Sequence, residues 1–314
     1  MKEPVINELL LNFPIKVRDD IGSISSNAGV LKAEQCVRIC QQLSLDLDNL
    51  MTQLLPIAAS FSNPTISDYR VGAVARGVAK DSSGMPNLYL GANFEFSGQA
   101  LCYSVHAEQS ALSNAWLNGE PRLEAIAVTA PPCGHCRQFL YEMTGDRTFP
   151  IILPSVSADK TAKPVDLSDL LPSAFGPLDL GSDRLLMEAS FGSNGLSLLD
   201  NNDELINGAL QAADLSYAPY TSNFAGCAIK LSDGKIFTGR YAENAAHNPS
   251  LSPFSSAFSS MMLGSGSVDN IEIVRVVLVE NPTKSSQKNV CQDQLLACRQ
   301  AVELEYVTAS MKYQ

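Results

Sequence analysis

The sequence predicts a protein of the α/β class that is built from two related units. Three observations lead to this prediction: the length of the chain, an alternation of strand and helix patterns, and an internal repeat. With 314 residues, the chain has room for two domains of roughly 150 residues each. Alternating strands and helices indicate sheets covered by helices, because each element must bury its apolar face against another.

The composition favours a folded protein that acts on a small molecule. Hydrophobic residues make up 45% of the chain and charged residues 18%, which suits ordinary apolar cores and not disorder. The 22 Lys and Arg against 33 Asp and Glu give a net charge of −11. Because nucleic-acid binding requires cations that neutralise phosphates, we expect no nucleic-acid partner.

The sequence also predicts a compartment. No apolar run approaches the roughly 18 to 20 residues of a membrane span or the core of a signal peptide, so we expect a cytoplasmic protein without membrane contact. Eight cysteines are too few for a disulfide scaffold of this length. In a reducing compartment, closely spaced cysteines more often bind metal or act in catalysis.

Local patterns predict the elements of the first unit in order. Residues 1–50 should form a helical segment, with good helix formers over 32–43. Apolar residues at helical spacing predict a helix from Leu47 to Phe61, which Pro56 should bend or restart. The remaining elements are expected to be a hairpin of two strands, a helix, a strand and a helix, over residues 71–79, 88–92, 106–117, 125–130 and 136–143.

An internal repeat points to a duplicated domain. A displacement of 148 residues places Gly91–Glu95 on Gly239–Glu243, and Ile126–Val128 on Val274–Val276. Between the two copies, several prolines and glycines mark a connection. We therefore expect four parts, namely the helical segment, a first unit, a linker and a second unit, at residues 1–50, 51–153, 154–184 and 185–314.

Two short motifs in the first unit carry chemistry. They are His106-Ala107-Glu108 and Pro132-Cys133-Gly134-His135-Cys136, and together they form the signature of zinc-dependent nucleobase deaminases. Two thiolates at a tight turn and one imidazole can converge on zinc (Zn²⁺) and leave the fourth position to water. A water bound in this way has its pKa lowered from 15.7 to about 7, which supplies hydroxide near neutral pH.

Glu108 is expected to move protons. It follows His106 by two residues, about 200° around an ideal helix, so it should not share the ligand face. A carboxylate beside the water can accept its proton, pass it to a ring nitrogen and help ammonia to leave. Cytosine and adenine rings both fit this chemistry, so these motifs alone do not define the substrate.

Longer segments show a resemblance to a family. The chain resembles the cytidine deaminases of the long, duplicated, dimeric bacterial type, whose domain is a three-layer α/β/α structure. The segments that carry this resemblance are Tyr69-Arg70-Val71-Gly72-Ala73, Gly91-Ala92-Asn93-Phe94-Glu95-Phe96, His106-Ala107-Glu108-Gln109-Ser110, Pro132 to Phe139, Ala174-Phe175-Gly176-Pro177 and Tyr241 to Ala246.

The resemblance implies a set of site residues. Zinc would be held by His106, Cys133 and Cys136, with Glu108 as the catalytic acid and base. Substrate would contact the Asn93-Phe94-Glu95 segment, in which Asn93 and Glu95 recognise the ribose. The implied zinc ligands, catalytic group and substrate contacts are, in that order, His106, Cys133 and Cys136; Glu108; and Asn93, Phe94 and Glu95.

Two aromatic residues are implied as further substrate contacts. Tyr69 falls where the family usually has a Phe that packs on the pyrimidine, so this chain differs there by a hydroxyl group. Phe175 matches a linker aromatic that reaches the site of the partner subunit. The resemblance therefore implies a homodimer with shared active sites.

The second unit is expected to lack a metal site. The displacement of 148 residues sets non-ligand residues against the zinc ligands and the catalytic carboxylate, so we expect one zinc per chain and a second unit that acts as a scaffold. The residues set against His106, Glu108, Cys133 and Cys136 are Phe254, Ser256, Asn281 and Lys284.

The leading functional hypothesis is hydrolytic deamination of cytidine and 2′-deoxycytidine to uridine and 2′-deoxyuridine, with release of ammonia, in pyrimidine salvage. Three alternatives remain open. The enzyme could act on a nucleotide or polynucleotide, the chain could be a zinc-stabilised binding protein, or Cys133 and Cys136 could form a structural zinc knuckle or redox pair. His135 is expected not to be a ligand, and Glu243 is either a relic of the duplication or a structural group at an interface.

Overall fold

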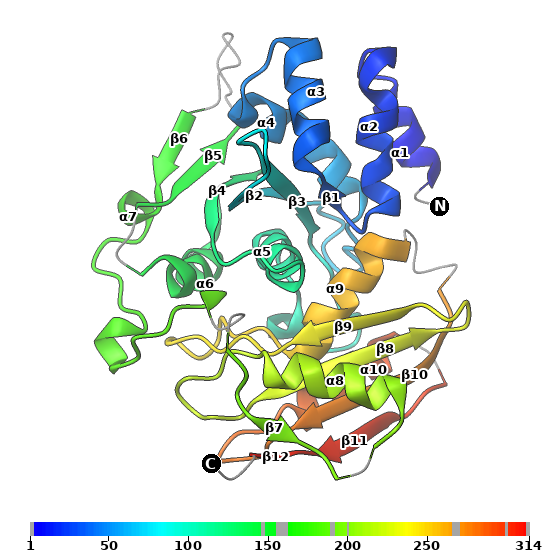
Figure 1. Cartoon of the computed structure of the whole chain (residues 1–314), viewed down its shortest axis with the longest axis vertical. Coiled ribbons are helices and arrows are strands. Elements are labelled where there is room, and N and C mark those ends of the chain that lie inside the picture. The colour runs from blue at the N-terminus through cyan, green and yellow to red at the C-terminus, as the bar shows by residue number, and fades with distance from the viewer. Residues whose placement is uncertain are drawn as a thin grey trace.

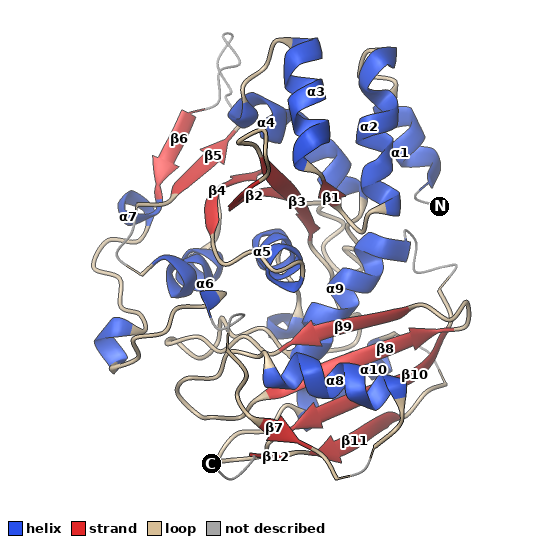
Figure 2. Ribbon diagram, viewed as in Figure 1, coloured by secondary structure: helices blue, strands red, loops and turns tan. Residues whose placement is uncertain are grey.

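The computed structural model describes residues 3–145, 148–154, 163–188, 192–199, 201–265, 271–298 and 301–311. It contains two mixed β-sheets with helices between them and on their outer faces (Figure 1). Figure 2 shows the N-terminal helices gathered beside the first sheet, with the C-terminus at the far end of the molecule near the second. The α/β class and the helical N-terminal segment are thus present.

The first sheet has six strands in the order β1-β3-β2-β4-β5-β6. Neighbouring strands are antiparallel except for β4 and β5, which are parallel. Two edge strands come from segments that the sequence assigned elsewhere, since β1 belongs to the helical segment and β6 to the linker. The strands are β1 (Val30–Leu31), β2 (Gly72–Lys80), β3 (Pro86–Ala92), β4 (Leu123–Val128), β5 (Pro150–Leu153) and β6 (Lys163–Asp166).

The second sheet repeats the central part of the first. Its order β9-β8-β10-β11 matches β3-β2-β4-β5, and its last pair is again parallel. A small sheet of β7 and β12 lies beside it. The strands are β7 (Leu196–Ser197), β8 (Ala225–Leu231), β9 (Ile236–Arg240), β10 (Ile273–Glu280), β11 (Leu304–Thr308) and β12 (Ser310–Met311).

Helices form the layers between and outside the sheets. α4 covers one face of the first sheet and α8 the outer face of the second, while α5 and α9 pack against each other between the sheets (Figure 1). The α-helices are α1 (Glu3–Leu10), α2 (Ile15–Ser26), α3 (Ala33–Leu43), α4 (Leu47–Ser60), α5 (Ala107–Leu117), α6 (Gly134–Thr144), α7 (Leu167–Leu170), α8 (Glu204–Asp214), α9 (Pro253–Ser265) and α10 (Lys288–Ala297). Two short 3₁₀ helices are η1 (Leu101–Tyr103) and η2 (Leu178–Leu180).

Most predicted elements of the first unit are present, with shifted ends. Of the two effects expected of Pro56, a bend or a restart, the restart is absent, because α4 is one helix that runs through Pro56. His106 lies outside α5 as its N-cap, so the argument from its angle around the helix does not apply to this residue. The reason is local: the His106 N–H is held by the side chain of Gln109, which ends the extended segment there.

Close backbone contact places α5 against β3. A Cβ atom on Gly91 would lie 2.1 Å from the backbone nitrogen of Ala111, so a larger residue would push the helix away. The second unit repeats this contact between Gly239 and Ala257, also at 2.1 Å. The duplication is therefore visible in the way each central helix rests on its sheet.

The register of the repeat differs from the prediction. Gly239 does correspond to Gly91, as predicted. However, Ala257 in α9 corresponds to Ala111 in α5, which is a difference of 146 residues in the sequence and not 148. The strand pairing shows that Leu278 in β10 corresponds to Val128 in β4, a difference of 150 residues. The residues set against His106 and Glu108 were therefore wrong by two positions. Ser252, not Phe254, lies opposite His106, and Phe254, not Ser256, lies opposite Glu108; Asn281 and Lys284 likewise do not lie opposite Cys133 and Cys136.

The two units are joined by a buried carboxylate. Glu142 on α6 accepts hydrogen bonds from the hydroxyl groups of Tyr217 and Tyr220 and from the backbone N–H of Ala245. All three donors belong to the second unit. Burial raises the pKa of Glu142, and these donors offset part of that cost. The helix that begins at the cysteine motif is therefore anchored in the second unit.

No helix in the described ranges is long and apolar enough to cross a membrane.

Candidate active site

Two helix N-termini bring the predicted zinc ligands together. His106 is the N-cap of α5 and Cys133 is the N-cap of α6, with Cys136 in the first turn of α6. Unpaired backbone N–H groups and the helix dipole favour thiolate over thiol at such positions. The turn between β4 and α6 therefore presents two sulfurs to a ring held by another helix.

The geometry of this cluster fits zinc. The Sγ atom of Cys133 lies 3.6 Å from Nδ1 of His106 and 3.7 Å from Sγ of Cys136. Tetrahedral zinc, with bonds of about 2.3 Å to sulfur and about 2.0 Å to nitrogen, separates two sulfurs by about 3.8 Å and a sulfur from a nitrogen by about 3.5 Å. The three ligand atoms all lie within 4.8 Å of one another. These side chains are thus placed at the corners that zinc requires.

Charge in the cluster supports metal binding. Hydrogen bonds from Cys136 and His106 lower the pKa of Cys133 to about 3, so this sulfur is a thiolate at neutral pH. The hydrogen bond to that thiolate and burial raise the pKa of Cys136. A metal cation bound between the two sulfurs would replace the proton that Cys136 donates to Cys133, because metal-bound thiols are deprotonated.

Glu108 lines a cavity of about 280 Å³, together with His106 and Cys133. Only 4% of Glu108 is accessible, and burial raises the pKa of its carboxyl group. A carboxyl group with a raised pKa can both take up and release a proton near neutral pH. The site thus combines a place for a metal with a proton carrier.

Asn93 and Glu95 line the same cavity. Oε2 of Glu95 accepts the backbone N–H groups of Ile66 and Ser67, and Oε1 accepts the Ser67 hydroxyl at 2.6 Å. Although burial raises it, these hydrogen bonds lower the pKa of Glu95 overall, so the group is ionised at neutral pH. Oε1 retains a lone pair for a ligand hydroxyl group.

The predicted aromatic contacts have different positions. Tyr69 is 61% exposed and lines the cavity. Phe94 is fully buried, packs edge-on against Phe258 and does not line the cavity, so it offers no surface to a substrate here. Phe175 is exposed and lies outside the cavity of its own chain.

Three residues support the site, of which Ser67 and Gln109 were not predicted to do so. Ser67 holds Glu95, and Gln109 holds the backbone of His106. His135 stacks on His106 with ring centroids 5.2 Å apart, and its Nε2 lies 3.3 Å from the Gln109 amide nitrogen. It is not part of the ligand cluster. The position of Gln109, three residues after a cap, was the signal that could have identified it.

Comparison with known families agrees with this site. Residues 46–151 and 167–292 each match the family described as the cytidine and deoxycytidylate deaminase zinc-binding region. These segments cover most of the chain and fall on its two units. The chain belongs to this family of zinc-dependent hydrolases.

Curated relatives match over nearly the whole length. A cytidine deaminase of Photorhabdus laumondii is 40% identical over 301 residues, which is 95% of this chain and 97% of the relative. A cytidine deaminase of Shewanella halifaxensis is 43% identical over 81% of this chain and 80% of its own. Among solved structures, the cytidine deaminase of Burkholderia pseudomallei is 25% identical and aligns all of its length with 42% of this chain, at a TM-score of 0.34.

Substitution of single zinc ligands should remove the metal. We expect the wild-type protein to hold one zinc per chain, and His106→Ala or Cys133→Ser to hold almost none, because two remaining ligands cannot compete with solvent. Zinc measured by plasma mass spectrometry after dialysis tests this. The matched control is Cys102→Ser, an exposed cysteine outside the cluster, which should keep its zinc. Two tightly bound zincs per wild-type chain would contradict the expectation.

Proposed function

We propose that the protein deaminates cytidine and 2′-deoxycytidine hydrolytically to uridine and 2′-deoxyuridine, releasing ammonia. The observation that supports this best is a single cavity lined by a zinc-compatible cluster, a buried carboxyl group and an ionised carboxylate. We place the reaction in pyrimidine salvage in the cytoplasm.

His106, Cys133 and Cys136 would hold zinc, which when bound supplies Lewis acidity that lowers the pKa of water. Glu108 performs the proton transfers. Its carboxylate accepts a proton from the attacking water and delivers it to N3 of the pyrimidine ring. It then carries a second proton to the exocyclic amine at C4, which leaves as ammonia while the carbonyl forms.

The sugar would occupy the outer part of the cavity. Oε1 of Glu95 can accept a hydrogen bond from a sugar hydroxyl, and Asn93 fixes the loop in place, since its amide bonds the backbone of Val71 and Tyr69. A site built around such a bond rejects a bare base that cannot supply it. Tyr69 would pack against the pyrimidine with its exposed ring.

The cavity favours nucleosides over phosphorylated substrates. Neither Lys nor Arg lines it among the described residues, and its acidic groups are Glu95 and Glu108. A phosphate would therefore meet negative charge and no cation to neutralise it. This argues against the nucleotide and polynucleotide alternatives.

Substrate preference can be measured directly. We expect turnover of cytidine and 2′-deoxycytidine, with kcat/KM for CMP and for a cytosine-containing oligonucleotide lower by at least about tenfold, since an unpaired charge costs more than about 1.4 kcal/mol. The loss of absorbance on conversion to the uracil product provides the assay. A preference for either phosphorylated substrate would refute the proposal.

The Glu108→Gln variant distinguishes two hypotheses, that the protein is an enzyme and that it is a zinc-stabilised binding protein. We expect this variant to keep its zinc and fold and to lose about 10² to 10⁴-fold in kcat, the contribution of positioned proton transfer. The matched control is Glu34→Gln, an exposed substitution at the start of α3, which should leave turnover unchanged. Wild-type turnover in Glu108→Gln would remove the carboxyl group from the mechanism.

We also propose a homodimer in which each chain completes the site of the other. Phe175 is exposed, as are Leu178 and Leu180 shortly after it, so this segment presents apolar surface that a partner could cover. Its backbone is fixed, because the Phe175 carbonyl accepts a hydrogen bond from Gln138 on α6 at 2.8 Å. The backbone that carries this exposed ring is therefore attached to α6.

Hybrid dimers test this arrangement. Glu108→Gln and Phe175→Ala should each be impaired, while a purified hybrid of the two should recover activity. In the hybrid, the intact Glu108 lies on the Phe175→Ala chain and receives Phe175 from the other chain. Two different affinity tags allow the hybrid to be isolated. If the hybrid is no more active than Phe175→Ala alone, Phe175 does not act across the interface.

A further inference from the structure

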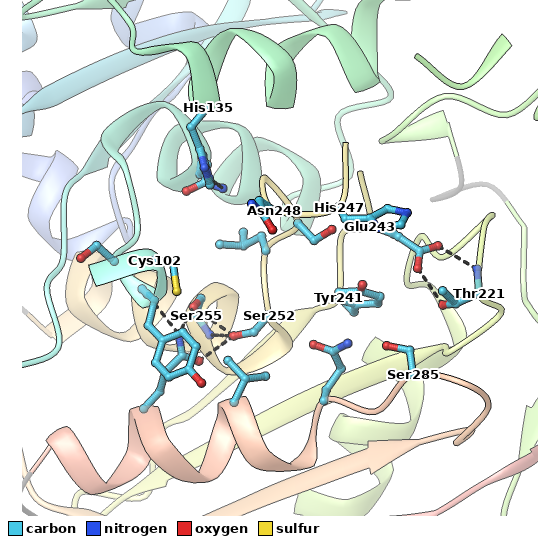
Figure 3. Close-up of a pocket in the computed structure, with 18 residues that line it drawn as sticks. Cys102, His135, Thr221, Tyr241, Glu243, His247, Asn248, Ser252, Ser255 and Ser285 are labelled. Carbon is cyan, nitrogen blue, oxygen red and sulfur yellow. Dashed lines mark hydrogen bonds between the residues drawn. The ribbon is translucent and has the colours of Figure 1, made fainter. Parts of the chain in front are cut away.

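A cavity larger than the active site lies at the boundary of the two units. Its volume is about 460 Å³, against about 280 Å³ for the cavity at the zinc cluster. Figure 3 shows it bounded by Tyr241, Glu243 and Thr221 from the second unit and by His135 and Cys102 from the first. This size falls in the range of small-molecule sites, roughly 300 to 1,000 Å³.

This cavity is the counterpart of the active-site cavity in the duplicated unit. Backbone bridges join Phe94 to Val105 in the first unit and Ala242 to Leu251 in the second, which fixes the correspondence between the two. The wall residues then correspond pair by pair. They are Ser67 with Thr221, Glu95 with Glu243, Ser104 with Ser250, Val105 with Leu251 and His106 with Ser252.

Glu243 keeps the hydrogen bonds of Glu95 atom for atom. Its Oε2 accepts the backbone N–H groups of Tyr220 and Thr221, and its Oε1 accepts the Thr221 hydroxyl at 2.7 Å (Figure 3). Only 3% of Glu243 is accessible. Burying a carboxylate is costly unless it is satisfied, and these hydrogen bonds satisfy Glu243 while it lines the cavity.

The groups that would perform chemistry are missing from this copy. Ser252 takes the place of the zinc ligand His106, and its hydroxyl is bound to Gln294 at 2.7 Å. Phe254, in the place of Glu108, is fully buried in the core. No metal-ligating cluster is found here within the described ranges. A molecule that entered this cavity could bind without being converted.

The walls also restrict the charge of a ligand. Among the described residues, neither Lys nor Arg lines the cavity, whose walls carry serines, glutamines, His135 and His247 around Glu243. A phosphate or carboxylate ligand would find no permanent cation there and would meet the charge of Glu243. A neutral molecule with several hydroxyl groups matches the walls and the carboxylate.

We propose that the second unit is a binding site for a second nucleoside, which it holds through sugar hydroxyls on Glu243 and does not deaminate. The choice of nucleoside rests on the proposed function, because it takes the sugar contact of Glu95 as its template. The base would extend toward the first unit, whose Gln109 and His135 form the opposite wall. Both residues contact the zinc ligand His106 on their other side.

The number of nucleosides bound per chain tests the proposal. Equilibrium dialysis with radiolabelled uridine, which cannot be deaminated, should give two sites per wild-type chain. Asn248 is exposed and projects into the cavity (Figure 3), so Asn248→Trp should block it and leave one site. The matched control, Asn12→Trp, adds the same ring at an exposed position in the N-terminal segment and should leave two.

Further variants separate this inference from the proposed function. Glu95→Gln should lose the active-site uridine and keep the second one, whereas Glu243→Gln should do the reverse, with zinc content and circular dichroism as checks on folding. Addition of 2′,3′-dideoxyuridine, which lacks both secondary hydroxyls, should not displace uridine from the second site in Glu95→Gln. If wild type binds one uridine and Glu95→Gln binds none, the second site is refuted while the active site stands. Two sites in Glu95→Gln would instead refute the sugar role of Glu95, and two sites in Asn248→Trp would refute the location.

Discussion

The burial of α5 is the constraint on which the rest of the structure depends. β3 approaches one side of this helix so closely that only glycine fits at position 91, and α9 packs against another. Between α5 and α9, the hydroxyl groups of Ser110 and Ser259 are 2.7 Å apart, and those of Ser113 and Ser256 are 2.8 Å apart. Small residues therefore permit close approach, and hydrogen bonds fix the rotation of one helix against the other.

A helix held in this way gives its first turn a fixed position. His106 and Glu108 precede and open α5, and the cavity forms where this end meets the turn before α6. Reactive groups at helix ends can be exposed to a ligand while the rest of each helix stays in the core. The duplicated unit uses the same construction around α9, and the loss of its metal ligands has left the cavity and its carboxylate in place.

The sequence predicted the fold class and the residues that meet at the metal cluster, because short motifs at strand and helix ends determine that geometry locally. It did not predict which neighbours of Glu95 face the cavity. In an extended segment adjacent side chains point to opposite sides, so Phe94 enters the core while Asn93 and Glu95 line the cavity. The register of the repeat was missed because the loops between matched elements differ in length, by two residues before α9 and by four residues between α9 and β10, and a single displacement cannot represent both changes.

The burial of Glu142 makes the first unit depend on the second for hydrogen bonds. Two phenols and an amide of the second unit satisfy this fully buried group, which lies on the same helix as Cys136. Cutting the chain in the linker would leave Glu142 without these hydrogen-bond donors, about two helical turns from Cys136. The second unit thus provides Glu142 with the hydrogen bonds that water would otherwise provide, and this contribution does not depend on any catalytic group of its own.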